Sequence, residues 1–534
     1  MNHEINIDSI RALEEQINEH EGAIIKLKRA RNSLLNVSTL PPEVLGDIFH
    51  WNVTLKGNFD GLEEGSHNFL LVCHHWFEVA SQTPELWSFW GNSLGDWEER
   101  CLRSAVGIPL DLVWNGLTHT FGSVSESQRM VLEDRAARDT IRRVHLQSFV
   151  HGLLTSIIAP LLSPSGGLRT NSLESLILRS EDRTPLDVSF FAHSHLSKLR
   201  CLKLAGCTIS SWDHLTSQTT LLTTLNLSID DEAPTPTMTQ LLSILASNPH
   251  LQKLILNQHA IPDNNNDGES CLVPLRHLKE LQLQGDTGQV FRLLRRLEHP
   301  NEMGMLSIDL FRCAITDIPQ TIGPYLQDYL QRRGSSRNGL GLTLSTCDRI
   351  TFIVGDAGRF HPSTLPSART LPFVSITVKL NPGLPEDASE KLTLDLIAHT
   401  PREEIVYFRT HGSLEAVKDL RVHMPNLRAL DLFRVPLLVA FPSLDQYGSR
   451  VPEIFPPSLQ HLFFERPRLD AYGWIPPIAF LSHRMSSGNQ LDSLRIHGPC
   501  HMCYELTRSV RDLVREFKID DECLESWCPS GECM

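Results

Sequence analysis

Cysteine and histidine residues that could bind a metal ion occur together in the segment 71–87. It contains Cys73, His74 and His75, and thiolates and imidazoles are the usual ligands of zinc. Successive side chains on a helix point about 100° apart, so three consecutive residues diverge and cannot bind one ion. The segment therefore predicts packing. Its apolar positions recur every three or four residues, as on one helical face: Val72, Cys73, Trp76, Val79 and Ala80.

The C-terminal tail holds a second set of residues with ligand chemistry. A Cys/His cluster is followed by cysteines at intervals of five. Two such clusters could hold zinc, but the second lacks the C-x-x-C spacing of a zinc knuckle. We therefore predict no metal site and no cofactor, and keep a zinc-binding tail as an alternative. The residues are His497, Cys500, His501, Cys503, Cys523, Cys528 and Cys533.

Other chemical motifs are incomplete. "DNNNDG" begins at Asp263 like a calcium loop, but the twelfth position is Pro274 instead of the bidentate glutamate, which favours a surface turn. No G-x-S-x-G elbow, phosphate loop or dinucleotide fingerprint occurs in a strand-and-helix context. We predict no catalytic residues, and hence a protein that is not an enzyme.

The composition limits the class of protein further. A chain of 534 residues is expected to form two to four packed units or one long repeat array. The formal charge of −14 argues against a general nucleic-acid binder. The N-terminus lacks a signal-peptide core. The most apolar run, "SFVHGLLTSIIAPLL", is too short to span a membrane and predicts a buried helix. We expect an intracellular protein, cytoplasmic or nuclear, whose cysteines are reduced.

A heptad-like pattern predicts a helix over residues 5–37. Acidic residues lie early and basic residues late in this segment, which suits the helix dipole. His20 and Arg31 interrupt the apolar seam, so the helix could pair with itself as a coiled coil or pack onto the following domain. The seam positions are Ile10, Leu13, Ile17, His20, Ile24, Leu27, Arg31 and Leu34.

Residues 38–92 have the pattern of a small helical module. Pro41 and Pro42 suit the start of a helix, and apolar residues follow at helical spacing. A polar loop separates this helix from the one over 71–82. Thr83 and Pro84 then indicate a further start, with Thr83 as the cap.

These residues resemble a known family. "LPPEVLGDIF", "LLVCHHWFEVA" and "TPELW" resemble the F-box, whose pattern is LP-x-E, V-C-x-x-W and L-W. The preceding charged helix and the following "WEERCLRSAVGIPLDLVW" are similar to the F-box-like proteins of mushroom-forming fungi. The resemblance implies a three-helix module that docks on a Skp-type adaptor, which links it to a cullin complex and a ubiquitin-charged enzyme.

The resemblance also implies roles for individual residues. Leu40 and Pro41 would seat in the adaptor groove, and Glu43 would cap the first helix. The others would form adaptor contacts or core, and the sequence does not separate these two roles. The implied adaptor-binding set is Leu40, Pro41, Glu43, Leu45, Ile48, Phe49, Val72, Cys73, Trp76, Leu86 and Trp87.

A repeated L-x-x-L-x-L pattern fills much of the remaining chain. Nine copies start at residues 173, 199, 222, 251, 278, 303, 427, 459 and 491. Each copy suits a short strand with alternate leucines facing inward, as in stacked leucine-rich repeats. Between 311 and 426 only "GLTLS", "FVSITVKL" and "IVYFRT" predict strands. A closed α/β domain is the alternative to a solenoid.

The predicted fold class is α+β: an N-terminal helix and a three-helix F-box, then an irregular α/β leucine-rich-repeat-like solenoid. We expect a helical connector at 93–165, the array at 166–500 and a Cys-rich tail at 501–534. The resulting hypothesis is the substrate-recognition subunit of a Skp–cullin–F-box ubiquitin ligase that binds an unidentified protein target through the array. The alternatives are a non-ligase F-box scaffold and, third, a zinc-binding protein.

Overall fold

The computed structural model divides the chain into two compact units. One contains residues 1–222 and 232–234, and the other contains residues 223–231 and 235–534. The described residues are 7–34, 40–56, 68–90, 107–116, 129–130, 132–134, 139–148, 151–162, 171–181, 186–194, 196–209, 212–230, 234–263, 272–300, 303–311, 318–333, 340–346, 349–357, 374–379, 386–411, 420–433, 435, 455–465, 475–497 and 504–519.

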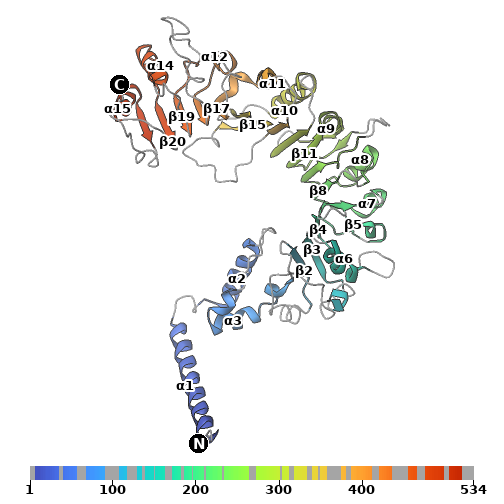
Figure 1. The fold of residues 1–534 in the computed structure, drawn as a ribbon. Coiled ribbons are helices and arrows are strands. Elements are labelled where there is room, and N and C mark those ends of the chain that lie inside the picture. The colour runs from blue at the N-terminus through green and yellow to red at the C-terminus, as the bar shows by residue number, and fades with distance from the viewer. Residues whose placement is uncertain are drawn as a thin grey trace, which may run out of the picture. The chain divides into compact units, whose positions relative to one another are not determined.

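The first unit begins with the expected N-terminal helix, α1 (Ile7–Ser33; Figure 1). The apolar side chains of its seam are open to solvent, from Ile10 at 45% to Leu27 at 71% exposure. Packing onto the following helices therefore does not cover this seam.

A small helical module follows α1. Its elements are α2 (Pro42–Lys56), η2 (Asn68–Leu71), α3 (His74–Ser81) and η3 (Pro84–Trp87). The ring of Phe49 stacks on Phe69 at 4.5 Å and lies 5.1 Å from Trp76. The indole Nε1 of Trp87 donates to the Ala80 carbonyl at 2.9 Å. These contacts close an apolar core that includes Leu45.

Two details of the module correct the sequence prediction. Val72 lies in a turn after η2 and is 57% exposed, because α3 begins only at His74, with Cys73 as its extended N-cap residue. Because η2 ends at Leu71 and α3 begins at His74, Val72 and Cys73 do not continue the helical spacing of α3 and do not share its apolar face. Thr83 occupies the N-cap position of η3, but its hydroxyl donates back to the Val79 carbonyl at 2.8 Å.

The parallel sheet of the first unit begins earlier than the leucine motifs predict. Residues 93–165, expected as a helical connector, contain the strands β2 and β3. The buried helix predicted from the apolar run in this segment is present as α6 (His151–Ile158), and η5 (Ala159–Leu161) extends it. The paired strands are β1 (Phe89–Trp90), β2 (Leu110–Gly116), β3 (Ile141–Ser148), β4 (Ser175–Ser180) and β6 (Cys201–Ala205).

The bend after β6 shows how one repeat is stacked on the previous one. Gly206 has a φ of 62°, and a Cβ there would lie 2.1 Å from the Ser180 carbonyl oxygen, so only glycine fits. The next residue, Cys207, is buried with its Sγ 3.8 Å from the Leu178 carbonyl. Short elements complete this part: β5 (Leu186–Asp187), η6 (Ser189–His193), β7 (Cys207–Thr208) and α7 (Trp212–Gln218).

The second unit opens with four parallel strands, and each contains a predicted leucine motif. A capping box between Thr237 and Gln240 starts the helix that follows β8. The elements are β8 (Thr224–Ile229), α8 (Met238–Ala246), β9 (Lys253–Gln258), β10 (Val273–Pro274), β11 (Glu280–Asp286), α9 (Thr287–Leu294), β12 (Leu297–Glu298) and β13 (Met305–Phe311).

An antiparallel insertion interrupts the array where the leucine pattern is weakest. β15 runs antiparallel between β14 and β16, while β13 pairs with β16 and β14 pairs with β17 in parallel. The elements are η7 (Ile318–Ile322), α10 (Gly323–Arg333), β14 (Leu340–Thr346), β15 (Arg349–Asp356), β16 (Val374–Lys379), α11 (Glu386–Ala398), η9 (Arg402–Glu404) and β17 (Ile405–His411).

Parallel pairing resumes after β17 and continues to the last described strand. The three late leucine motifs form β18, β19 and β20, as predicted. The molecule is thus an α/β protein with N-terminal helices and a long, mostly parallel repeat array. The elements are α12 (Leu420–His423), β18 (Ala429–Phe433), β19 (His461–Glu465), α14 (Ile475–Ser486), β20 (Ser493–His497), α15 (Tyr504–Leu513) and β21 (Glu516–Ile519).

Among the described residues, no helix is both long and apolar enough to cross a membrane.

Candidate protein-docking surface

Helix α2 carries apolar side chains on two different faces, one buried and one exposed. Leu45 and Phe49 are 0% and 1% exposed and fill the core of the module. Val44, Ile48 and Trp51 are 42%, 46% and 64% exposed. Their spacing of four and three residues places these three side chains on one helical face. An apolar face that the module's own core does not use is typical of a protein-binding surface.

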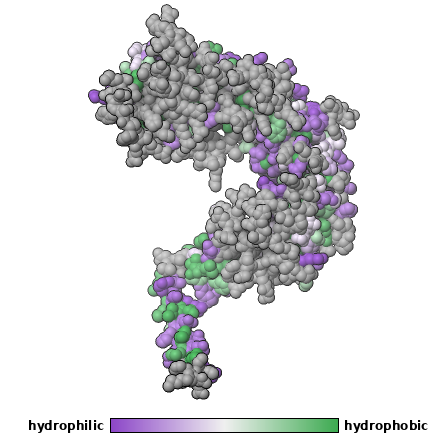
Figure 2. Space-filling view, in the orientation of Figure 1, coloured by the Kyte–Doolittle hydropathy of each residue, from purple (hydrophilic) through white to green (hydrophobic). Residues whose placement is uncertain are grey.

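The short helix η2 adds two more exposed apolar side chains. Phe69 and Leu70 are buried, and the stacking of Phe69 on Phe49 holds η2 against α2. Leu71 and Val72 face solvent, at 76% and 57% exposure. Figure 2 shows hydrophobic side chains at the surface of this module. We call the five exposed side chains the docking surface: Val44, Ile48, Trp51, Leu71 and Val72.

The structure separates the predicted adaptor-binding residues by burial. Ile48 and Val72 belong to the docking surface, and Pro41 and Glu43 are also exposed, with Glu43 in the first turn of α2. The half-buried residues lie between these extremes and are Leu40, Cys73 and Trp76. The core residues are Leu45, Phe49, Leu86 and Trp87, each at most 1% exposed.

Three members of the docking surface were not predicted as site residues. Val44, Trp51 and Leu71 are apolar, and apolar residues are normally assigned to a core. For Val44 and Trp51 a signal was present in the sequence, because the helical spacing places them on the same side of α2 as Ile48. Leu71 carried no such signal, because it lies on a single turn whose geometry the helical pattern does not describe.

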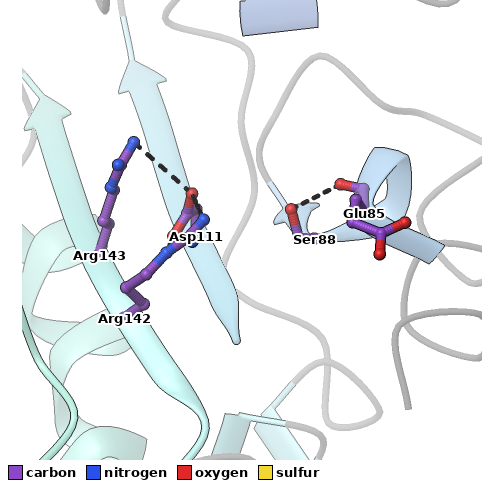
Figure 3. A network of polar contacts seen from close by, with 5 residues as sticks. All are labelled: Glu85, Ser88, Asp111, Arg142 and Arg143. Carbon is purple, nitrogen blue, oxygen red and sulfur yellow. Dashed lines mark hydrogen bonds and ion pairs between the residues drawn. The ribbon is translucent and has the colours of Figure 1, made fainter. Parts of the chain in front are cut away.

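A buried ion pair joins the first two long strands of the sheet, β2 and β3, next to the helical module (Figure 3). Asp111 of β2 is 0% exposed and accepts two hydrogen bonds from Arg142, at 3.0 and 2.7 Å, with Arg143 at 3.9 Å. This pairing raises the pKa of Arg142. The backbone N–H of Asp111 donates to the carbonyl of Ser88, directly after η3, at 2.7 Å. The backbone of Asp111 therefore fixes the module to β2, and its side chain fixes β2 to β3.

A second candidate surface lies on the sheet of the second unit. The Tyr407 hydroxyl donates to Asp431 at 2.9 Å, and Arg409 bonds to Glu465 at 2.5 Å. The Arg409 guanidinium also lies 5.3 Å from the centre of the Phe433 ring. Because side chains alternate along a strand, this network faces away from the buried residues that separate its members. Arg409 and Glu465 remain 28% and 29% exposed, so both can reach a bound chain.

Burial shifts the ionisation of this network. Desolvation raises the pKa of Asp431 despite the attraction of Arg409 and the hydrogen bond from Tyr407. Burial also raises the pKa of Tyr407, next to the charge of Asp431. Burial opposes the charge of Arg409, but the carboxylates of Asp431 and Glu465 raise its pKa above the ordinary value. The guanidinium therefore keeps its charge and holds the two carboxylates together.

The predicted metal-type motifs fall mostly outside the described residues. In the tail motif only His497 is described, at the exposed end of β20. In "DNNNDG" only Asp263 is described, and its carboxylate accepts a hydrogen bond from Gln289 of α9 at 2.7 Å. Within the part of the chain that the structure describes, no group of three or more His, Cys, Asp or Glu side chains could hold a metal ion.

Comparison with protein-family models gives no matching family for this chain, and comparison with curated proteins gives no matching relative.

Proposed function

We propose that this chain is the substrate-recognition subunit of a Skp–cullin–F-box ubiquitin ligase. The F-box-like module would bind a Skp-type adaptor through the docking surface, and the repeat array would bind the target protein. The observation that carries the proposal is the set of five large apolar side chains exposed on a small module whose core is already filled. Such side chains contribute binding energy when a partner removes them from water.

The arrangement of the helical module and the repeat array along the chain supports the adaptor-binding role of the first and the target-binding role of the second. The helical module is joined to β2 by the hydrogen bond from the Asp111 N–H to the Ser88 carbonyl, so an adaptor bound to the module would also hold the start of the array. In the second unit, Arg409 and Glu465 are partly exposed and offer charged groups to a target, while the buried Tyr407 and Asp431 support them from below. This proposal requires no catalytic group in the chain.

The direct test is calorimetric titration of the full chain with a purified Skp-type adaptor. We expect Ile48→Lys to abolish measurable binding, because the lysine charge would be buried at an apolar contact. Trp51→Ala should weaken binding by about 30-fold, the effect typical of an aromatic hot spot.

A matched control is available in the same unit. Leu221 is 43% exposed, close to the 46% of Ile48, but lies outside the docking surface. Leu221→Lys should leave adaptor affinity unchanged. The proposal fails if the folded wild-type chain does not bind the adaptor, or if both lysine variants reduce the affinity equally.

Co-purification of a cullin distinguishes the ligase hypothesis from the scaffold hypothesis. With the adaptor bound, the ligase hypothesis expects a cullin to co-purify with the full chain. Adaptor binding without cullin recruitment would instead support a non-ligase scaffold. Charge reversal at Arg409 should leave adaptor affinity unchanged in either case, because that residue belongs to the second unit.

A further inference from the structure

Helix α1 has an apolar seam that remains open to solvent along its length. Ile17 and Ile24 are 55% and 50% exposed, and Leu13 and Leu27 are 58% and 71% exposed. Figure 2 shows hydrophobic and hydrophilic side chains interspersed on this helix. Helices of this kind gain most of their stability when the apolar face packs against a partner. The seam therefore indicates an interaction that the described part of one chain does not supply.

The charges of α1 are divided between its two halves. Residues 7–21 contain five acidic residues and one arginine, whereas residues 22–34 contain four basic residues and no acidic residue. A second α1 running in the same direction would place like charges side by side. A second α1 running in the opposite direction would place acidic residues beside basic ones. Charge complementarity thus favours an antiparallel pair.

The two polar positions of the seam favour the same direction. In a parallel, in-register pair, His20 would meet His20 and Arg31 would meet Arg31 of the other copy. In an antiparallel pair centred at residue 22, His20 lies opposite Ile24, and Arg31 lies opposite Leu13.

The same register aligns the other seam and flanking positions. Ile10 faces Leu34 and Ile17 faces Leu27. Beside the seam, Glu14 faces Lys28 of the other copy on both sides of the twofold axis. Every apolar seam residue then has an apolar or long amphipathic partner.

We propose that α1 pairs with α1 of a second copy of this chain in an antiparallel coiled coil, so that the protein is a dimer. The helix of 27 residues is about 40 Å long, enough for more than three heptads of contact. The proposal is independent of the adaptor-binding role, which uses α2 and η2.

The test is the mass of the full chain in solution, measured by sedimentation from low to high micromolar concentration. We expect a dimer for the wild type and a monomer for the double variant Ile17→Glu, Ile24→Glu. Both sites are exposed, so the fold should be retained, and circular dichroism checks this. A monomeric wild type, or a double variant that remains dimeric, overturns the proposal.

Charge reversal tests the direction of the pair. Glu14→Lys and Lys28→Glu should each weaken the dimer by about tenfold, and combining them should restore it. Glu15→Lys is the matched control, because this position is on the helix surface away from the seam. An antiparallel pair is excluded if the control weakens the dimer equally or if the combined variant is weaker than both single variants.

Discussion

The helical module and the repeat array differ in how far their apolar side chains are buried. Along β11 of the array, buried and half-buried residues alternate, and the inward Leu281 and Leu283 are at most 1% exposed. Along α2 of the module, Leu45 is fully buried while Trp51 is 64% exposed. The module has a complete core and further apolar side chains outside it, and these outer side chains are the ones to which we have assigned the proposed docking role.

The largest effect should come from the core of the module. Trp87→Ala removes a side chain that is 1% exposed and leaves the Ala80 carbonyl without its indole donor. We expect a loss of about 3–5 kcal/mol in the free energy of unfolding. Urea denaturation followed by circular dichroism measures this. A loss below about 1 kcal/mol would contradict the placement of Trp87 in the core.

The next largest effect should come from the ion pair between β2 and β3 at the start of the sheet. Asp111→Ala leaves Arg142 without its carboxylate, and breaking a fully buried pair costs about 3–5 kcal/mol. Because the Arg142 side chain is 33% exposed, water can replace part of the interaction, and we expect about 2–3 kcal/mol. The control is Glu133→Ala, which breaks an exposed pair with Arg129 and should cost less than about 1 kcal/mol. If urea denaturation gave equal losses of unfolding free energy for the two variants, burial would not strengthen the Asp111–Arg142 pair.

A smaller effect should appear as pH dependence in the array. Burial lowers the pKa of His299 below its ordinary value of 6.5, and its Nε2 lies 2.9 Å from the hydroxyl of Tyr325. The folded chain therefore binds this proton less readily than the unfolded chain does. The stabilisation is complete above pH 6.5 and is lost as the pH falls through the lowered pKa.

Thermal melts between about pH 7 and pH 5 test this contribution. The wild type should lose stability on acidification, and His299→Gln, which can still accept the Tyr325 hydrogen bond, should lose less. Identical profiles for the wild type and His299→Gln would rule out the contribution of His299.

The smallest effect on stability is expected at the docking surface. Leu71→Ser changes a side chain that is 76% exposed and should alter the free energy of unfolding by no more than about 0.5 kcal/mol. The neighbouring Leu70→Ser, at 4% exposure, should cost several times more. Similar unfolding curves for the two serine variants would contradict the division of η2 into a buried and an exposed side.

The repeats illustrate what the sequence alone determined. The nine leucine motifs predicted nine strands, because alternate apolar residues at a period of two suit a strand with one buried face. The start of α2 at Pro42 and the buried helix α6 were likewise local features. By contrast, β2 and β3 lack the leucine motif and were expected as a helical connector. Their strand form depends on pairing with neighbours that are distant in the sequence.

Tertiary structure decided two features that local patterns could not. β15 runs antiparallel between β14 and β16, and such pairing is set by contacts between strands and not by any one strand. The sequence also offered no means of ranking Leu45 against Ile48, since both are apolar and both suit a helix. Leu45 is buried and Ile48 is 46% exposed because α3 and η3 pack against only one side of α2. Hydrophobicity determined that α2 would have apolar faces, and the position of its neighbours determined which face remained exposed.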